Sequence, residues 1–270
     1  MMIAPEFRYT EADHAQYESE GYAILDNCLA PSTVDEIRAE IDALVEQLHP
    51  TRTADNDLIC VHQCGARWLW ELAIAPPLLD MVERQVGPNI TLWTTHILAK
   101  PPRTGIVVPW HQDEPYWNIS GRMAGGIWIA IDDVDEGNGT MSVLPGWHKR
   151  GTLPRLTVGD AAPGVFNEEI DRASLPADTD AVKVTYRLKA GQLAIHNTMI
   201  PHCSTPNTSD RWRRVVVLRY IAADGELNPK TLQDYRDLFS FEREFFLVRG
   251  EDVNGRGLRR SPFGGEPAKL

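Results

Sequence analysis

Residues 109–113, Pro-Trp-His-Gln-Asp, are the stretch from which the fold and site of this chain are interpreted. The segment is predicted to be extended, so His111 and Asp113, two residues apart, project from the same face of a sheet. One further histidine is then enough to present three ligands to a metal. Two histidines and one carboxylate, with open positions opposite, are the ligand set of non-haem Fe(II) oxygenases. A lone His-x-Asp tripeptide is weak evidence, so a second matching stretch is needed.

Such a stretch spans residues 191–220, GQLAIHNTMIPHCSTPNTSDRWRRVVVLRY, and offers His196 and His202 as the third ligand. Residues 213–221 are apolar and β-branched, which predicts a buried strand. Arg213 at its start needs an anionic partner if it is buried. A planar guanidinium suits a carboxylate, such as that of a metal-bound co-substrate. Arg214 points to the opposite face of this strand, where it is expected to form a structural ion pair.

The order of six short motifs makes the chain resemble the phytanoyl-CoA dioxygenase family of Fe(II)/2-oxoglutarate oxygenases. Each motif is loose by itself, but their order and spacing are specific. The motifs are GYAILDNCLAPSTVDEIRAEIDAL, KPP, WHQD, WIAIDDVDEGNGTMSVLPGWHKRG, GQLAIH and PHCSTPNTSDRWRR. The resemblance implies a double-stranded β-helix, a jelly roll of the cupin type. It also implies Fe(II), 2-oxoglutarate as co-substrate, and O2.

The resemblance assigns roles to individual residues by position. His111, Asp113 and His202 match the iron ligands, which favours His202 over His196. Arg213, eleven residues after His202, matches the arginine that binds the distal carboxylate of 2-oxoglutarate. The other residues matched to the co-substrate site are Ser204, Trp128, Thr94, His96 and Leu98. Cys203 departs from the glycine of many members, which bears on local packing rather than on chemistry. His96 is equally well interpreted as a satisfied core histidine.

Five further residues are candidates for the substrate pocket. Tyr116 and Trp117 directly follow the ligand stretch, and His62 lies in a segment that can face the pocket. Phe239 and Phe241 lie on a helix predicted over residues 232–246, which can act as a lid. Two apart on a helix, they face different sides, so only one of them would reach the cavity. The alternative for the aromatic residues is burial in the core.

The whole chain is predicted to be mainly β with helical additions, a double-sheet jelly roll backed by N-terminal helices. Residues 149–180 show little periodicity and are predicted to be a surface excursion. We treat residues 1–270 as one domain with a loose tail from about 250 to 270. Helices are expected over residues 10–20, 31–48, 68–75, 78–86 and 232–246. Strands are expected over residues 22–25, 90–99, 107–113, 125–131, 140–144, 181–186, 192–196 and 213–221.

Composition restricts the classes of partner and location. The chain has 270 residues and a formal net charge of -11, which argues against nucleic acid or an anionic membrane as a partner. The N-terminus has no signal-peptide pattern, and no apolar run reaches the ~20 residues of a membrane helix. Four cysteines are too few for a disulfide framework and favour a cytoplasmic protein. We expect a monomer or homodimer acting on a small molecule.

The expected activity is hydroxylation, or desaturation, epoxidation or ring closure by the same oxidant, with release of succinate and CO2. Asp113 supports this interpretation, because related halogenases have Ala or Gly at that position. The family oxidises acyl-CoA thioesters, amino acids and secondary metabolites. An apolar, aromatic-lined cavity favours a natural-product intermediate or a lipid-like acid. The alternatives are a non-redox metal-dependent enzyme of the cupin type and a small-molecule-binding protein with a vestigial site.

Overall fold

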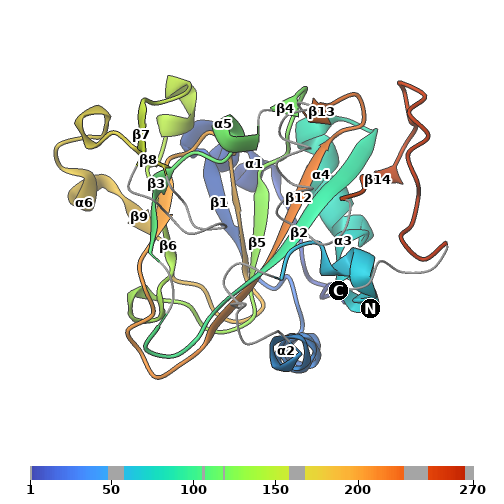
Figure 1. The fold of residues 1–270 in the computed structure, drawn as a ribbon, viewed down its shortest axis with the longest axis horizontal. Coiled ribbons are helices and arrows are strands. Elements are labelled where there is room, and N and C mark those ends of the chain that lie inside the picture. The colour runs from blue at the N-terminus through green and yellow to red at the C-terminus, as the bar shows by residue number, and fades with distance from the viewer. Residues whose placement is uncertain are drawn as a thin grey trace.

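Two antiparallel sheets face each other in this computed structural model, which describes residues 2–47, 58–104, 107–117, 119–157, 168–227 and 243–264 (Figure 1). The larger sheet has the strand order β1 (Tyr22–Leu25), β10 (Leu193–His196), β5 (Gly126–Ala130), β12 (Arg213–Ala222), β2 (Ile90–Lys100) and β14 (Phe246–Arg249). The smaller sheet has the order β3 (Val108–His111), β11 (His202–Ser204), β6 (Met141–Val143) and β9 (Val184–Thr185). This arrangement confirms the predicted jelly roll.

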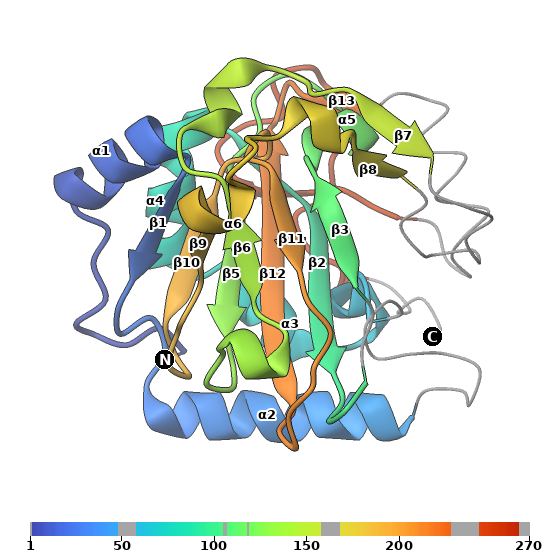
Figure 2. The same cartoon turned by 90° about the vertical axis from the view of Figure 1, so that its left-hand side faces the viewer.

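Helices α3 (Arg67–Ala73) and α4 (Pro76–Val86) cover the face of the larger sheet that lies away from the smaller one (Figure 1). Helix α2 (Pro31–Glu46) runs across one end of the strands and buries Val34, Ile37 and Ile41 (Figure 2). Helix α1 (Glu11–Glu20) begins with a capping box between Thr10 and Asp13 and ends at Gly21 in the left-handed conformation. The N-terminal helices therefore form the predicted backing layer.

The larger sheet separates two apolar layers, and β12 contributes to both. Val216, Leu218 and Tyr220 face the helices and join the main core. Val215 and Val217 face the smaller sheet and join a second cluster between the sheets. This alternation follows from the two-residue period of a strand. The functional site lies on the second side, between the sheets.

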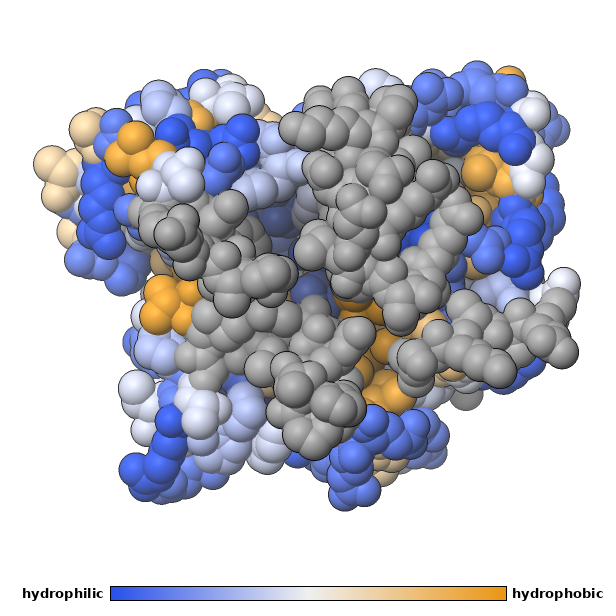
Figure 3. Space-filling model, in the orientation of Figure 1, coloured by the Kyte–Doolittle hydropathy of each residue, from blue (hydrophilic) through white to orange (hydrophobic). Residues whose placement is uncertain are grey.

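The remaining short elements surround this sandwich. They are α5 (Glu114–Trp117), α6 (Thr179–Val182), β4 (Ile119–Ser120), β13 (Glu226–Leu227), β7 (Arg155–Thr157), β8 (Glu168–Ile170) and the 3-10 helices Val61–Cys64, Glu136–Asn138, Trp147–Arg150 and Arg172–Ser174. Strands β7 and β8 pair with each other, so the predicted surface excursion contains a small two-stranded sheet. No helix of the described ranges is long and apolar enough to cross a membrane. On the face in Figure 3, hydrophilic side chains predominate around smaller apolar patches.

Outside the ligand stretch, two predicted elements differ clearly from the structure. The strand expected over residues 181–186 is wrong in its first half, because α6 extends to Val182 and only β9 is a strand. The helix expected over residues 232–246 is wrong at its end, because Phe246 begins β14 and pairs with Leu92. Residues 228–242, which include Phe239 and Phe241, lie outside the described residues. The strand conformation of Phe246 is decided by its pairing with β2, and no local sequence pattern shows that pairing.

The C-terminal segment as far as Gly264 contacts the body of the protein. The backbone N–H of Leu247 donates to the carbonyl of Arg259 at 2.8 Å. The guanidinium of Arg67 lies 4.1 Å from the centre of the Phe263 ring. These contacts attach part of the segment that was predicted to be loose.

Candidate metal centre and co-substrate pocket

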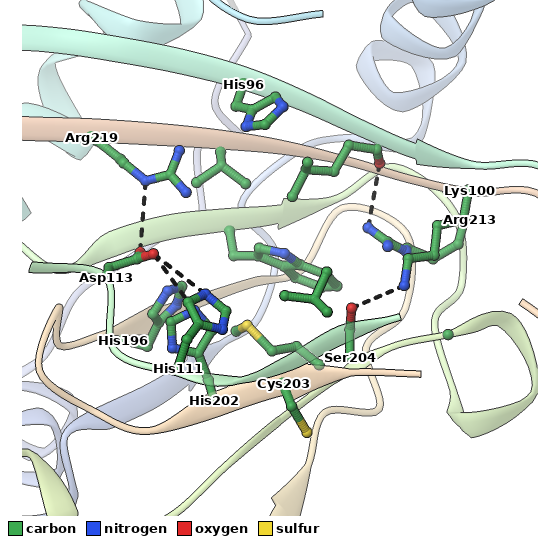
Figure 4. Close-up of a pocket in the computed structure, with 16 residues that line it drawn as sticks. His96, Lys100, His111, Asp113, His196, His202, Cys203, Ser204, Arg213 and Arg219 are labelled. Atoms are coloured by element: carbon green, nitrogen blue, oxygen red, sulfur yellow. Dashed lines mark hydrogen bonds and ion pairs between the residues drawn. The ribbon is translucent and has the colours of Figure 1, made fainter. Parts of the chain in front are cut away.

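A pocket opens between the two sheets and is lined by side chains from seven strands and the residues next to them (Figure 4). Strand β12 contributes Arg213, Val217 and Arg219, so one face of a single strand spans the pocket. The other lining residues are His96, Leu98, Lys100, Val108, His111, Asp113, Trp128, Gly139, Met141, His196, His202, Cys203 and Ser204. The pocket brings the predicted iron ligands and most of the predicted co-substrate residues together.

His111, Asp113 and His202 form a compact, buried group whose ligand atoms all lie within 4.8 Å of one another. The two histidines face each other on the paired strands β3 and β11. Oδ1 of Asp113 is 3.6 Å from Nε2 of His111 and 3.8 Å from Nε2 of His202. Three ligand atoms at these separations can converge on one ion and leave the opposite positions open.

Backbone carbonyls fix the orientation of both imidazoles. Nδ1 of His111 is 2.8 Å from the carbonyl oxygen of Pro109, and Nδ1 of His202 is 3.0 Å from that of Ile200. A carbonyl only accepts, so each Nδ1 carries the hydrogen and each Nε2 presents its lone pair toward Asp113. This is the support that metal-ligating histidines usually have. The donor set therefore fits a divalent metal such as iron(II).

Asp113 reaches the site by a different route from the one predicted. Strand β3 ends at His111, and Asp113 lies in a bend before α5, so the expectation that one strand face projects both side chains is wrong. The backbone N–H of Asp113 donates to the carbonyl of Thr198 at 2.9 Å. The Gln112 amide donates to the carbonyl of Met199 at 2.7 Å. Contacts with the chain before β11 thus hold the bend.

Arg219 is a pocket residue that the sequence analysis did not identify. Its Nε lies 3.8 Å from Oδ2 of Asp113. Burial by itself raises the pKa of the Asp113 carboxyl, but the charge of Arg219 outweighs burial and holds that pKa well below its usual range. Asp113 is therefore a charged carboxylate, as a metal ligand requires. The signal for Arg219 was present in the sequence, because Arg219 has the same strand phase as Arg213.

His196 lines the pocket but does not belong to the ligand group. The centre of its ring is 5.2 Å from that of His202. It is paired across the sheet with Gly126, where an added Cβ would lie 3.0 Å from the imidazole. Burial lowers the pKa of His196 to about 4, so the ring is neutral at pH 7. The geometry supports His202 as the third ligand.

The end of the pocket away from Asp113 holds two buried cations, Arg213 and Lys100, which face each other in the β12–β2 pairing (Figure 4). Nη1 of Arg213 is 3.4 Å from the carbonyl oxygen of Leu98. Nζ of Lys100 donates to Oγ of Ser204 at 2.9 Å and to the carbonyl of Thr205 at 2.6 Å. Two cations beside a hydroxyl fit the distal carboxylate of 2-oxoglutarate. Lys100 was noted in the sequence only as part of KPP.

Of the other residues matched to the co-substrate site, the structure places three in the pocket and one outside its lining. Trp128, His96 and Leu98 line the pocket. Thr94 is not among the lining residues; its hydroxyl lies 3.3 Å from Sγ of Cys60. Burial and the nearby arginines hold the pKa of His96 well below its usual value, so its imidazole is neutral. Three of the four residues therefore occupy positions from which they can contact the co-substrate.

Two of the substrate-pocket candidates, Tyr116 and Trp117, lie beside the site rather than in its lining. Tyr116 meets His111 edge to face, with ring centres 6.1 Å apart, and its hydroxyl donates to the carbonyl of Glu168 at 2.9 Å. Trp117 packs against Trp93 with ring centres 4.9 Å apart. Both residues thus form an aromatic wall next to the ligands.

His62 is on the far side of the larger sheet, so the structure does not place it in the pocket. Its Nδ1 is 2.8 Å from Oγ1 of Thr95, and its ring stacks on Trp70 at 6.2 Å. Burial, with a smaller effect of Arg243, lowers the pKa of His62 to about 3. It is a neutral core histidine.

The neighbours of Arg213 have structural ion pairs. Arg214 contacts Asp132 at 2.9 Å and Asp42 at 2.7 Å, as the opposite strand phase predicted. Arg211 contacts Asp135 at 2.7 Å on the surface. Of the candidates Arg211, Arg213 and Arg214, only Arg213 lines the pocket.

A jelly roll that holds two histidines and one carboxylate beside a cationic pocket defines the class of non-haem iron oxygenases. Comparison with known families agrees with this class. Residues 17–215 match the family model described as "Phytanoyl-CoA dioxygenase (PhyH)". The match covers more than half of the chain, and the chain belongs to this family.

Individual relatives are more distant. A probable alpha-ketoglutarate-dependent hypophosphite dioxygenase of Stutzerimonas stutzeri is 30% identical over 150 residues, which are 55% of this chain and 51% of that protein. The chain thus spans about half the length of this relative. The structure of the apo form of ThoJ, a non-haem monooxygenase, has a TM-score of 0.70 and 26% identity, and the match covers 88% of this chain and 84% of that one.

A third comparison bears on the cofactors. The epimerase SnoN, solved with Fe3+, alpha ketoglutarate and nogalamycin RO, has a TM-score of 0.67 and 22% identity, and the match covers 90% of this chain and 96% of that one. At this identity it shows a shared fold. The family membership and the group of His111, Asp113 and His202 confirm the predicted cofactors, iron and 2-oxoglutarate.

Proposed function

We propose that this protein is an Fe(II)- and 2-oxoglutarate-dependent dioxygenase that oxidises an unactivated C–H bond of a small organic molecule. The observation that carries the proposal is a single pocket with His111, Asp113 and His202 at one end and Arg213 at the other. When bound, the iron and 2-oxoglutarate supply the oxidant, since decarboxylation with O2 gives succinate and CO2 and provides one oxygen atom for the substrate.

The residues of the chain bind and orient these groups. His111, Asp113 and His202 would hold the metal, with both imidazoles fixed by their Nδ1 contacts. Arg213 would hold the distal carboxylate of 2-oxoglutarate in a paired charged contact. Lys100 holds the Ser204 hydroxyl at the same end and adds positive charge. Burial of the pocket strengthens these charged contacts and excludes water from the reaction.

The neutral side chains favour an organic substrate. Leu98, Met141, Trp128 and Val217 give the pocket an apolar lining, and Tyr116 lies beside it. Hydroxylation is the reaction that an intact Asp113 supports best; desaturation, epoxidation and ring closure need the same oxidant. We infer a natural-product intermediate or a lipid-like acid as the substrate. The four free cysteines support a cytoplasmic location, and the protein is expected to be a monomer or homodimer.

The decisive experiment measures succinate formation from 2-oxoglutarate with Fe(II) and O2 across a panel of organic substrates. A true substrate raises succinate formation and yields an oxidised product in equal amount. A His111→Ala variant should form neither. Conversion of a substrate without O2 or 2-oxoglutarate would support the non-redox alternative and contradict the proposal. Tight binding of a small molecule with no succinate would instead support a binding protein.

A further inference from the structure

Gln112, the residue between two of the three candidate metal ligands, has a fully buried side chain that does not line the pocket. Its Nε2 donates to the carbonyl oxygens of Met199 at 2.7 Å and Gly151 at 2.9 Å. Its Oε1 accepts from the backbone N–H of Leu153 at 2.8 Å. A carbonyl only accepts and a backbone N–H only donates, so these partners fix the orientation of the amide. Both of its N–H donors and its oxygen are thus used.

The Gln112 amide joins three segments that are far apart in the sequence. Met199 lies three residues before His202, in the segment that leads into β11. The other two partners belong to the start of the surface excursion, just before β7. Gln112 itself directly precedes Asp113. One side chain therefore connects the two stretches that carry the metal ligands with a third stretch that carries none.

The amide acts on the ligands through one residue of backbone on each side. Asp113 directly follows Gln112. Ile200 directly follows Met199, and its carbonyl oxygen lies 3.0 Å from Nδ1 of His202. The two ligands whose Oδ1 and Nε2 are 3.8 Å apart are thus both attached next to the amide. Leaving a buried donor or acceptor without a partner is costly, so the amide favours one relative placement of the two stretches.

The surface excursion contacts the ligand stretch at a second point. Strand β8 pairs with β7 and lies against β3 (Figure 2). The Tyr116 hydroxyl donates to the carbonyl of Glu168 on β8 at 2.9 Å, and Arg155 on β7 contacts the Glu168 carboxylate at 2.7 Å. The Tyr116 ring in turn meets His111 edge to face. The excursion is therefore attached to the ligand stretch at Gln112 and at Tyr116.

We propose that Gln112 is a positioning residue of the metal site, which sets the placement of Asp113 relative to His202 and couples both to the surface excursion. The inference rests on the proposed function for the identity of the metal. Removal of contacts that orient metal ligands typically changes metal affinity by about 10- to 100-fold. Because a bound metal holds Asp113, it should also order the excursion through the amide.

The test compares the wild-type protein with Gln112→Met and Asn138→Leu, which each replace a buried amide by an apolar group of similar size. The Asn138 side chain is also fully buried and has as many hydrogen bonds. Its Nδ2 donates to the carbonyls of Asp133 at 2.8 Å and Trp212 at 3.4 Å, and its Oδ1 accepts from the N–H of Asp135 at 2.9 Å. None of these partners lies on a ligand-bearing segment. Asn138→Leu is therefore the matched control for lost stability, which urea unfolding of the metal-free proteins measures.

Anaerobic Fe(II) titration and hydrogen exchange are the two readouts of positioning. Gln112→Met should weaken Fe(II) binding by about tenfold or more. Asn138→Leu should keep Fe(II) affinity within about twofold, because its bonds belong to other segments. In the wild-type protein, saturating Fe(II) should slow hydrogen exchange in peptides that cover residues 151–157. This slowing should persist in Asn138→Leu and disappear in Gln112→Met.

A second pair of variants covers a failure of Gln112→Met to fold. Gln112→Glu keeps the length of the side chain and the oxygen that accepts from Leu153, but it loses at least one N–H donor. Asn138→Asp is its matched control. The same difference in Fe(II) affinity and in hydrogen exchange is expected for this pair.

Several outcomes would overturn the proposal. Equal Fe(II) affinities of Gln112→Met and the wild-type protein, or an equal loss in Asn138→Leu, would mean that the amide contributes to stability alone. Slowing of exchange by Fe(II) that survives in Gln112→Met would remove the coupling to the excursion. Fe(II) binding without an absorption band when 2-oxoglutarate is added anaerobically would contradict the proposed function alone, because the Fe(II) affinities would still decide the role of Gln112.

Discussion

His196 and His202 show how position decides the role of chemically identical residues. Both are buried, both line the pocket, and their rings are 5.2 Å apart. Only His202 has its Nδ1 at a backbone carbonyl and its Nε2 within 4 Å of Asp113. The sequence placed both near the metal, and the family resemblance selected His202. The structure supplies the physical reason for that choice.

The first prediction is therefore that His202→Ala and His196→Ala differ. His202→Ala should abolish turnover and weaken Fe(II) binding strongly, since one of three ligands is lost. His196→Ala should keep metal binding, because the imidazole of His196 lines the pocket without belonging to the ligand group. Anaerobic Fe(II) titration and succinate formation measure the two effects, with circular dichroism as the control for folding. If metal binding were lost in His196→Ala and kept in His202→Ala, His196 and not His202 would be the third ligand.

The second prediction concerns Asp113. Asp113→Gly should abolish hydroxylation while 2-oxoglutarate still binds, because Arg213 and the two histidines remain. The absorption band of the anaerobic Fe(II) and 2-oxoglutarate complex measures this binding. Loss of the band would show that Asp113 is also needed to assemble the site. Halide transfer is not expected, since it also requires a different substrate position.

The third prediction concerns Arg213, whose loss should affect the co-substrate and not the metal. Arg213→Ala should cost about 2–5 kcal/mol in 2-oxoglutarate binding, which is about 30- to several-thousand-fold in affinity. Arg213→Lys should recover part of this loss. The measurement is the 2-oxoglutarate dependence of succinate formation, and Arg211→Ala is the matched control. A tenfold or larger shift in Arg211→Ala, with none in Arg213→Ala, would show that the wrong arginine had been chosen.

At the scale of elements, β12 organises both the core and the site. It pairs with β2 and β5, and its alternate residues face different layers. Long strands of this kind were predictable, because β12 is a run of apolar, often β-branched residues apart from its three arginines. Strand β11 and helix α6 were not predicted, since three or four residues carry no period of their own. The prediction also placed Asp113 on a strand. It was wrong there because the bend at Asp113 is held by contacts with residues distant in sequence.

The fourth prediction uses neighbouring residues of β12. Val216→Ala removes two methyl groups from the helix-side core and should reduce the free energy of unfolding by about 1–3 kcal/mol. It should leave 2-oxoglutarate affinity within about twofold, because Val216 faces away from the pocket. Val217→Ala truncates a pocket wall and should change the 2-oxoglutarate dependence more than Val216→Ala does. Urea unfolding and succinate formation measure both, and the reverse ranking would contradict the strand phase.

At the scale of the whole molecule, folding and chemistry use different layers. The main core lies between the larger sheet and the helices. The group of His111, Asp113 and His202, together with Arg213, lies between the two sheets. The sequence was sufficient for the layers, and its motif order predicted the group of His111, Asp113 and His202 and the position of Arg213, which the structure brings into one pocket. It did not show that His62 and Thr94 lie outside the pocket, because that depends on how the segment before α3 packs on β2.

The last prediction follows from this separation. Removal of metal with a chelator should leave the protein folded, because the helix-side core contains none of the ligands. A ligand at 100 times its Kd stabilises the folded state by about 2.7 kcal/mol, which is roughly 5–10 °C in Tm for a chain of this size. Anaerobic Fe(II) and then 2-oxoglutarate should each raise Tm. In Arg213→Ala the first increment should persist and the second should largely disappear, whereas in His202→Ala both should shrink. Unfolding on chelation alone, or a full 2-oxoglutarate increment without Arg213, would mean that the site and the core are not separate in this way.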